Sequence, residues 1–518
     1  MSGRSKSSKD VEAPAESKRV ESDFPKGWTS AALGDLVAFM LGGDWGTEAA
    51  EASPDYVKVR VVRGTDFRHW QESRAATAAE RAVKKSSLEK RSLKPGDIVV
   101  EVSGGGPSQP VGRSVLIDEA AIESSDQPLV CSNFFRLVRL RGGVESAFVN
   151  HFLNFSVRSG AFDEFQTQTT NLRNLNFTDY LTKTFVPLPP FAEQCRIVAK
   201  LEAVLAKVAT AQARLSHLPT LLRRFRQSVL AAACSGKLTA HWRMEHSLPV
   251  NAPDLDAATP DLVATDLPNG WHVKTLNDCC AKIIDGNYGA EYPKKDEFIS
   301  SGIPFLTSAA ISEDGGVLDT EVRYISPEKH AALRKAQTTI GDVLFTNRGA
   351  RVGATTLLTD SRFQISNIGP QVTRLAANPE LLVPKFLFFW MRTSQFKEVM
   401  RDRNGGSAMN FLNLTVTKSL PMVLPPLFEQ QEIVRRVETL FAFADQIEAR
   451  LKHTNAYVDK LTPSLLAKAF SGELVPTEAN LAEREGRDYE SAEQLLEGIH
   501  NTQSMSAPQA KRGRKVKA

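Results

Sequence analysis

One stretch of the chain occurs twice, and this duplication constrains the fold more than any other feature. Residues 188–238 and 424–474 align without a gap at a constant offset of 236, and 20 of the 51 positions are identical. Both copies begin Leu-Pro-Pro, continue with Glu-Gln and Ile-Val, and end in Ser-Gly-x-Leu. Self-similarity of this length indicates that one structural unit has been duplicated within the chain.

Each copy predicts a long helix that begins directly after two prolines. Pro189-Pro190 and Pro425-Pro426 favour extended backbone, and Glu193 and Glu429 follow in the first turn, where the helix dipole stabilises a carboxylate. Apolar residues then recur at steps of four and three, which places them on one face of a helix of about 27 residues, or roughly 40 Å. This predicted seam consists of Ile197, Leu201, Val204, Val208 and Leu215 in the first copy and Ile433, Val437, Leu440, Ile447 and Leu451 in the second.

Because neither seam can be buried by its own helix, we expect the two helices to pack on each other, antiparallel, as a pseudo-twofold core. The small residues Ala211 and Ala444 would allow a close approach. The alternative is that each helix is an ordinary amphipathic helix that covers its own domain. Pro219 stands in the first copy where the second has Asn455, so the length of the first helix is open.

Length and composition narrow the class of protein. A chain of 518 residues is too long for one core and suggests two to four domains. Its 42% hydrophobic and 24% charged residues are typical of globular proteins. The sequence has no long apolar run and no hydrophobic signal core, and its five cysteines are scattered without zinc spacing. We therefore expect a cytoplasmic protein. The net charge of +4 is too small to indicate nucleic acid by itself.

A second repeated segment shows that the duplication includes more than the helices. PKGWTSAALGDL at 25–36 matches PNGWHVKTLNDC at 268–279 in Pro, Gly, Trp, Leu and Asp, so a globular domain precedes each long helix. Both domains are expected to be mixed α/β. Strands are predicted at 57–62, 97–102, 114–117 and 134–140 before a helix at 145–157, and at 304–306, 342–346, 354–358 and 371–375 before a helix at 384–400. The predicted organisation is a disordered segment 1–23, a domain 24–187, a long helix with a short following helix 188–246, a linker 247–267, a domain 268–423, a second long and short helix 424–481, and a polar tail 482–518 that is basic at its end.

Motifs for catalysis are absent from the sequence. It lacks a GxxxxGK[ST] phosphate loop, HExxH, an EF-hand loop, paired CxxC, and the Asn/Asp-Pro-Pro-aromatic tetrapeptide of amino-methyltransferases. Binding signals are more positive, since residues 58–94 hold eleven Lys and Arg against four Asp and Glu, with Phe67 and Trp70 among them. Such an excess can contact phosphates. The alternative is a solvated helix, because 75–85 is helix-like.

Turns and polar runs supply further binding candidates. The Gly-rich turns 103–113 and 346–353 follow corresponding strands, where glycine lets backbone N–H groups approach a phosphate and an adjacent Arg can reach a base. They could instead be ordinary hairpin turns. The polar runs 166–174 and 403–410 could read bases or be ordinary loops. The candidate DNA-binding residues are Arg60, Arg63, Arg68, Lys84, Lys85, Ser103, Gly104, Gly105, Arg113, Gln166, Gln168, Asn171, Arg173, Asn287, Thr346, Asn347, Arg348, Arg351, Arg403, Asn404, Ser407 and Asn410.

The chain resembles the specificity subunit of type I restriction-modification enzymes over nearly its full length. The resemblance rests on the two LPP-x-x-EQ-x-x-IV segments at 188–198 and 424–434, on the SGKL and SGEL endings, and on the strand starts Gly96-Asp97 and Gly341-Asp342. VRGTDF at 62–67 and NRGARVG at 347–353 are also similar to loops of this family.

The resemblance implies two target recognition domains that each read half of a bipartite double-stranded DNA site. The paired helices would set the spacing and dock methyltransferase subunits, two by expectation. It also implies no catalytic residue, metal or cofactor in this chain. S-adenosylmethionine would bind to the methyltransferase subunits, and ATP and Mg to restriction/translocase subunits. A rod of roughly 40 Å could place two readers about one DNA turn apart. Two other hypotheses are a coiled-coil adaptor with two protein-binding heads and a nuclease hidden in one head.

Overall fold

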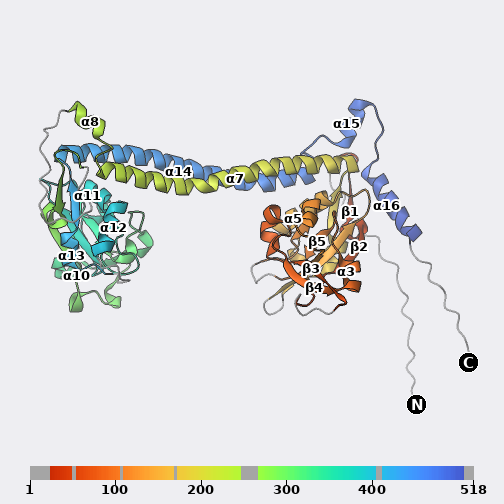
Figure 1. Ribbon diagram of the computed structural model, residues 1–518, viewed down its shortest axis with the longest axis horizontal. Helices are drawn as coiled ribbons and strands as arrows, with labels where there is room; N and C mark the ends of the chain where they lie inside the picture. The colour runs from red at the N-terminus through yellow and green to blue at the C-terminus, as the bar shows by residue number, and fades with distance from the viewer. Residues whose placement is uncertain are drawn as a thin grey trace, which may run out of the picture. The chain divides into compact units, whose positions relative to one another are not determined.

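The computed structural model describes residues 24–48, 54–104, 109–168, 172–246, 267–403 and 411–506. These residues form two compact units. The first combines the chain up to Ala213 with the part from Asn455 onward, and the second is Arg214–Thr454. Each unit therefore contains one globular head and a part of both long helices (Figure 1).

Two sheets form the head of the first unit. One has the order β2-β9-β5-β7 with antiparallel neighbours, and the other has the order β4-β3-β8, in which β3 and β8 are parallel. Their strands are β2 (Val37–Gly42), β3 (Tyr56–Val62), β4 (Ala79–Lys84), β5 (Ile98–Glu101), β7 (Ser114–Leu116), β8 (Leu129–Cys131) and β9 (Phe135–Leu140). Helix α5 (Ser146–Arg158) buries Phe148, Val149 and Leu153 in the core of this unit. The four predicted strands and the predicted helix are confirmed.

Smaller elements complete this head. β1 (Thr29–Ala32) pairs with β12 (Phe185–Leu188) just before the first long helix. The others are α1 (Leu33–Leu36), α2 (Trp70–Ser73), α3 (Lys85–Arg91), β6 (Ser103–Gly104), α4 (Glu119–Glu123), β10 (Gln166–Gln168), β11 (Arg173–Leu175) and α6 (Phe177–Lys183). The helix considered at 75–85 was wrong. Residues 79–84 form β4, because pairing with β3 buries Ala82 and Val83, and tertiary context overrides local helix propensity.

The head of the second unit repeats this framework. Its sheets have the orders β14-β21-β18-β19 and β16-β15-β20-β17, and β15 and β20 are parallel like β3 and β8. The strands are β13 (His272–Thr275), β14 (Cys280–Asp285), β15 (Ile303–Leu306), β16 (Arg323–Ile325), β17 (Gln337–Thr338), β18 (Val343–Thr346), β19 (Thr355–Leu357), β20 (Ser366–Ile368), β21 (Val372–Ala377) and β22 (Pro421–Leu424). The helices are α9 (Leu276–Cys279), α10 (Pro327–Ala332), α11 (Pro384–Met391), α12 (Ser394–Arg403) and α13 (Leu414–Ser419). The four predicted strands are confirmed, whereas the single helix predicted at 384–400 is two helices.

The long helices are α7 (Phe191–Cys234) and α14 (Leu427–Phe470), with 44 residues each. Both exceed the 27 residues expected, and both continue through an internal proline, Pro219 and Pro463. The seam pattern stopped short of the real helix ends, because the last turns pack on the heads rather than in the heptad seam.

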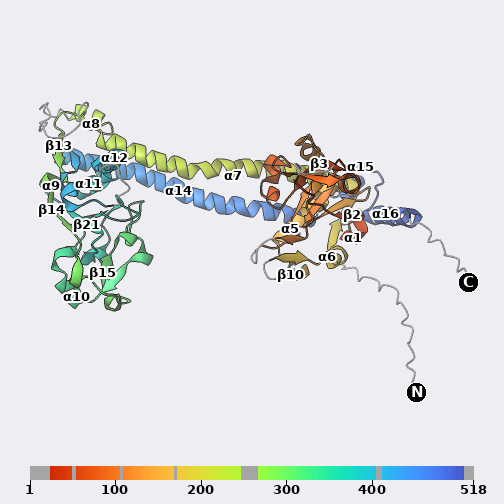
Figure 2. The same ribbon diagram turned by 60° about the horizontal axis from the view of Figure 1, so that its bottom comes forward.

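The two helices pack antiparallel, as the heptads predicted (Figures 1 and 2). In the first unit, Ile197 and Leu201 of α7 share a core with Leu466 and Ala469 near the end of α14. In the second unit, the start of α14 shares a core with the end of α7, through residues Ile433, Val437, Val229, Leu230 and Ala233. All ten predicted seam residues are buried or half-buried.

Further helices follow each long helix. They are α8 (Ala240–Glu245), α15 (Glu478–Glu485) and α16 (Ala492–Ser506). The prediction of a polar tail from 482 missed α16, whose residues Ala492, Leu495 and Ile499 are buried in the core of the first unit. Its apolar residues stand within the otherwise polar and charged segment 482–518, so composition alone hid the amphipathic face.

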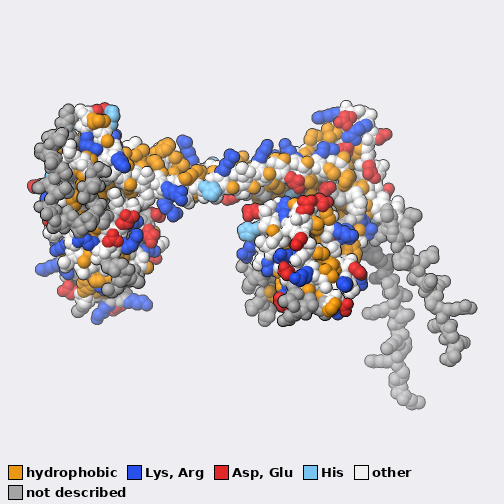
Figure 3. All heavy atoms as spheres, in the orientation of Figure 1, with side chains coloured by type: hydrophobic (Ala, Val, Ile, Leu, Met, Phe, Trp, Pro, Cys, Tyr) orange, Lys and Arg blue, Asp and Glu red, His pale blue; other side chains and the backbone are white. Residues whose placement is uncertain are grey.

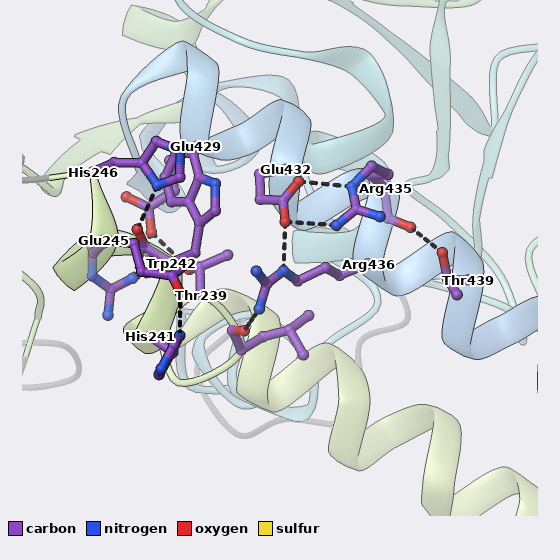
Figure 4. A network of polar contacts seen from close by, with 12 residues as sticks. Thr239, His241, Trp242, Glu245, His246, Glu429, Glu432, Arg435, Arg436 and Thr439 are labelled. Carbon is purple, nitrogen blue, oxygen red and sulfur yellow. Dashed lines mark hydrogen bonds and ion pairs between the residues drawn. The ribbon is translucent and has the colours of Figure 1, made fainter.

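A buried glutamate in the first turn of each long helix joins the helix to its head. Glu193 accepts hydrogen bonds from Trp28 Nε1 (2.9 Å) and from the backbone N–H of Glu478 (2.7 Å). Glu429 accepts one from Trp271 Nε1 (2.8 Å) and belongs to the polar network of Figure 4.

In that network Thr239 Oγ1 donates to Glu429 Oε1 (2.7 Å), and Arg243 forms an ion pair with the same carboxylate. Two turns further along α14, Arg436 donates to Glu432 (2.6 Å) and to the carbonyl oxygen of Leu238 (3.0 Å). The end of the first duplicated stretch is thereby held on the beginning of the second.

The glutamine after each of these glutamates makes the complementary contact. Gln194 accepts from the backbone N–H of Glu145 (2.8 Å) and donates to Pro189 O (2.9 Å). Gln430 does the same with Val383 and Pro425, both at 2.8 Å. The Pro-Pro-x-x-Glu-Gln motif is thus the joint between helix and head.

Candidate nucleic-acid interface

The Gly-Asp pair before each central strand fixes one end of that strand. Asp97 accepts from the backbone N–H of Lys94 (2.7 Å) and forms an ion pair with Arg139 (2.7 Å). Asp342 accepts from the N–H of Thr339 (2.8 Å) and pairs with Arg374 (2.7 Å). Since these aspartates are buried, they are structural, and the Gly-rich turns at the other strand ends are left as candidates for binding.

In the first head, the Gly-rich turn and the polar run predicted from the sequence lie together. β6 pairs with β11, which places Gly104 opposite Arg173 and Ser103 opposite Asn174. Ser103 Oγ donates to Asn174 Oδ1 (2.6 Å). Gln166 accepts from the N–H of Val111 (3.2 Å), so this side chain supports the turn from inside.

A cavity of about 620 Å³ opens beside these strands. Five of the predicted residues line it, namely Arg63, Arg68, Ser103, Gly104 and Arg113. Arg113 is fixed by two bonds to the buried carboxylate of Glu101 (2.8 and 2.7 Å), whereas Arg68 is exposed. The lining holds three guanidinium groups, of which Arg113 is paired with Glu101 and Arg63 with Asp66. The exposed Arg68 is therefore the lining cation best placed to meet an anionic ligand such as a phosphate.

Other predicted residues of this head do not line the cavity. Arg60 donates to Ala78 O (3.1 Å) and lies 4.0 Å from Glu80. Lys84 and Lys85 are exposed where β4 meets α3, and Gln168 is exposed on β10.

The second head brings its predicted turn to the same place. Arg348 faces Phe411 in an isolated bridge, and its guanidinium lies 4.2 Å from the centroid of that ring. Leu412 donates its N–H to Asn347 O (2.8 Å), as Leu175 does to Val102 O (2.9 Å) in the first head. The pair Arg348–Phe411 therefore occupies the positions of Ser103–Asn174.

Several predicted residues of the second head are buried and support this turn. Asn347 Nδ2 donates to Asp285 Oδ1 and Thr373 Oγ1, both at 3.0 Å. Thr346 and Asn287 are also buried. Arg351 donates to Ala309 O (2.8 Å), and the exposed Arg403 ends α12. Gly105, Asn171, Asn404, Ser407 and Asn410 lie outside the described residues.

Sequence reasoning missed two aromatic residues at equivalent turns. Trp45 lines the cavity of the first head, and Tyr288 follows the corresponding strand of the second. Burial first, and then Asp285, raises the pKa of the Tyr288 phenol, and the nearby Arg348 guanidinium opposes this shift. The signal was present, because GDWG at 43–46 and GNYG at 286–289 share the offset of 243 that relates Trp28 to Trp271.

Two other classes of site are not evident in the described part of the chain. No group of three or more His, Cys, Asp or Glu side chains there could hold a metal ion. None of the helices described has the length and apolar character to span a membrane. All five cysteines fall within the described residues and are free thiols.

Comparison with known proteins shows which proteins the chain is similar to. Residues 268–454 match the family model of the type I restriction modification DNA specificity domain. The chain is 36% identical over 301 residues to the type I restriction enzyme EcoBI specificity subunit of Escherichia coli, covering 57% of this chain and 59% of that subunit. It is 28% identical over 456 residues to the StySPI specificity subunit of Salmonella potsdam, covering 87% of this chain and 90% of that subunit.

A solved structure supports the fold. The HsdS subunit from Thermoanaerobacter tengcongensis aligns with a TM-score of 0.53 at 20% identity, over 88% of this chain and all of that one. At this identity the likeness speaks for the fold alone, and that fold includes the duplicated heads and paired helices described above. Residues 268–454 thus match the DNA specificity domain of type I restriction-modification enzymes, and most of the chain is similar to their specificity subunits.

Proposed function

We propose that the chain reads a bipartite sequence in double-stranded DNA, one half with each head, and holds the other subunits of the enzyme on its long helices. One observation carries this proposal. The two heads share the same strands, and Ser103–Asn174 in one head stands where Arg348–Phe411 stands in the other. One backbone framework with different side chains at an exposed edge is what two readers of different sequences require.

The long helices offer surface for partner subunits. Leu221, Phe443 and Tyr457 are more than half exposed, at 53%, 57% and 62%. Figure 3 shows hydrophobic side chains among the Lys and Arg on the surface of these helices. Exposed apolar side chains of this size favour protein–protein contact. We assign this surface to the methyltransferase subunits, of which we expect two. We expect the restriction/translocase subunits to make further contacts with the chain.

We assign methylation and cleavage of the DNA to those partner subunits. S-adenosylmethionine would bind to the methyltransferase subunits, and ATP and Mg to the restriction/translocase subunits. This chain would contribute recognition only and would work in the cytoplasm, where the DNA is. These assignments rest on the family and on the absence of catalytic motifs from the sequence.

The helices would also set the distance between the two half-sites. An α-helix of 44 residues is about 66 Å long, so the estimate of one DNA turn made from 27 residues no longer holds. Inserting seven residues into both α7 and α14 keeps the seam in register. We expect this insertion to change the gap between the half-sites but leave both half-sites unchanged.

The test is a selection from a randomised double-stranded DNA library with the complete chain bound to its methyltransferase subunits. The expected result is one bipartite sequence, and methylation of that sequence in the same complex. Failure to enrich any sequence, together with no DNA binding at low salt, would overturn the proposal and favour the adaptor. Cleavage of DNA by the isolated chain with Mg²⁺ would place a nuclease in one head instead.

A further inference from the structure

We propose that Trp45 and Tyr288 are equivalent DNA-contacting side chains, one in each head, and that each packs its ring on a deoxyribose or base edge of one half-site. This inference rests on the proposed function and deepens it. It assigns a direct contact to two residues on strand-end turns that neither the charge pattern nor the Gly-rich turns had indicated.

The two turns are built alike. Gly43 donates its N–H to Phe135 O (3.1 Å), and Gly286 donates to Val372 O (3.0 Å), so each turn is tied to the first residue of the neighbouring strand. A Cβ atom at Gly43 would lie 2.2 Å from Cys131 O, and one at Gly286 would lie 2.1 Å from Gly369 O. Only glycine fits at these two close approaches, so each turn packs directly against neighbouring backbone.

Each turn presents an aromatic ring to solvent beside a cation. Trp45 is 36% and Tyr288 is 47% exposed. The Arg81 guanidinium lies 4.8 Å from the Trp45 ring, and Lys335 Nζ lies 6.0 Å from the Tyr288 ring. Singly exposed rings are common on protein surfaces, but here a ring recurs at the equivalent turn of both heads beside a cation, and this recurrence favours a binding role.

The surroundings fit a nucleic acid. In the first head, Trp45 shares its cavity with Arg68 and Arg113, and in the second head, Tyr288 lies within the electrostatic reach of Arg348. On a duplex, an aromatic ring can pack on a deoxyribose or a base edge, and an arginine beside it can contact a phosphate. The arrangement supplies both contacts at equivalent positions of both heads.

The test uses the complete chain with its methyltransferase subunits and, as the probe, the duplex that the wild-type complex selects from the library. Trp45→Ala and Tyr288→Ala are each expected to weaken binding about tenfold, and Trp45→Phe and Tyr288→Phe by less than about threefold, since the ring is retained. Phe39→Ala is the matched control, because Phe39 is 38% exposed on the preceding strand beside Arg139 but does not line the cavity.

Hydroxyl-radical footprinting distinguishes the DNA contacts of one head from those of the other. Trp45→Ala should lose protection in one half-site only and Tyr288→Ala in the other. Should Trp45→Ala fail to fold, the difference in fluorescence between the wild type and Trp45→Phe gives the emission of Trp45 alone. Binding of the duplex should quench this emission. Unchanged footprints in both alanine variants, or an unquenched difference, would overturn this inference. A wild-type complex that protects no bipartite sequence would instead overturn the proposed function.

Discussion

Trp28 donates its indole N–H to the carboxylate of Glu193 at 2.9 Å, across 165 positions of sequence. The bond ties the first residues of a head to the first turn of the helix that leaves it. Trp271 and Glu429 repeat the bond at 2.8 Å in the second unit. Both carboxylates are fully buried, so loss of the indole donor would leave a buried acceptor without that hydrogen bond.

This joint predicts the effect of removing one donor. Trp28→Phe and Trp271→Phe keep most of the ring but remove the N–H, and each should lower the free energy of unfolding of its unit by about 1.5–3 kcal/mol, since a hydrogen bond to a charged group is lost. Differential scanning calorimetry measures the shift. Trp45→Phe is the control. Because the Trp45 ring is exposed, this variant should unfold as the wild type does. Equal melting profiles for all three variants would contradict the role of the joint.

The ion pairs of Glu478, one of which holds α15 on the first turns of α7, predict that the stability of the first unit depends on acidic pH. Glu478 forms ion pairs with Arg196 and Arg487, both at 2.6 Å. Burial opposes its ionisation, but the bonds from Arg487 and Arg196 outweigh burial and hold its pKa below the ordinary value of 4.5. The folded state therefore gains stability from ionised Glu478 above pH 4.5 and loses it as the pH falls through the lowered pKa.

Glu478→Gln should accordingly lower the melting temperature at pH 7 and reduce the further loss on acidification below pH 4.5. The measurement is a series of thermal melts from pH 7 to pH 3. Glu483→Gln, on the exposed side of the same helix, should follow the wild-type curve. A variant whose acid limb is as steep as that of the wild type would rule out this linkage.

The positions shared by Ser103–Asn174 and Arg348–Phe411 predict a change of specificity without loss of assembly. Arg348→Ser with Phe411→Asn should alter the bases selected in the half-site of the second head, where one good contact contributes about 1–3 kcal/mol of discrimination. The half-site of the first head should stay unchanged. Library selection with the double variant measures both halves at once. Selection of the wild-type sequence by this variant would show that the pair does not read bases.

The cavity of the first head predicts a change in salt dependence. Arg68→Gln should reduce the slope of log K against log salt by about 0.9, the value for one lost phosphate contact. Lys85→Gln serves as the comparison, because Lys85 is exposed but does not line the cavity, and its slope should match the wild type. Titrations of the selected duplex at several salt concentrations give the slopes. Equal slopes for both variants would remove Arg68 from the interface.

Local patterns predicted the central strands of both heads and the antiparallel seam, because alternation and heptad spacing follow from how strands and helices bury one face. They failed at 79–84, where pairing with β3 turned a helix-like run into β4. They also failed at α16, whose few buried residues find their core in the first unit. In both cases the deciding contacts come from residues far away in the sequence.

By itself, the sequence determined the duplication, the two heads, the paired helices and the resemblance to specificity subunits, since repeats and spaced motifs are written in the order of the residues. The tertiary structure decided which polar residues face outward. It buried Thr346, Asn347 and Asn287, tied Arg113 to Glu101, and brought Trp45 and Tyr288 to equivalent turns. The physical reason is that exposure and pairing depend on the neighbours that folding supplies, and a residue type reveals only what its side chain could do.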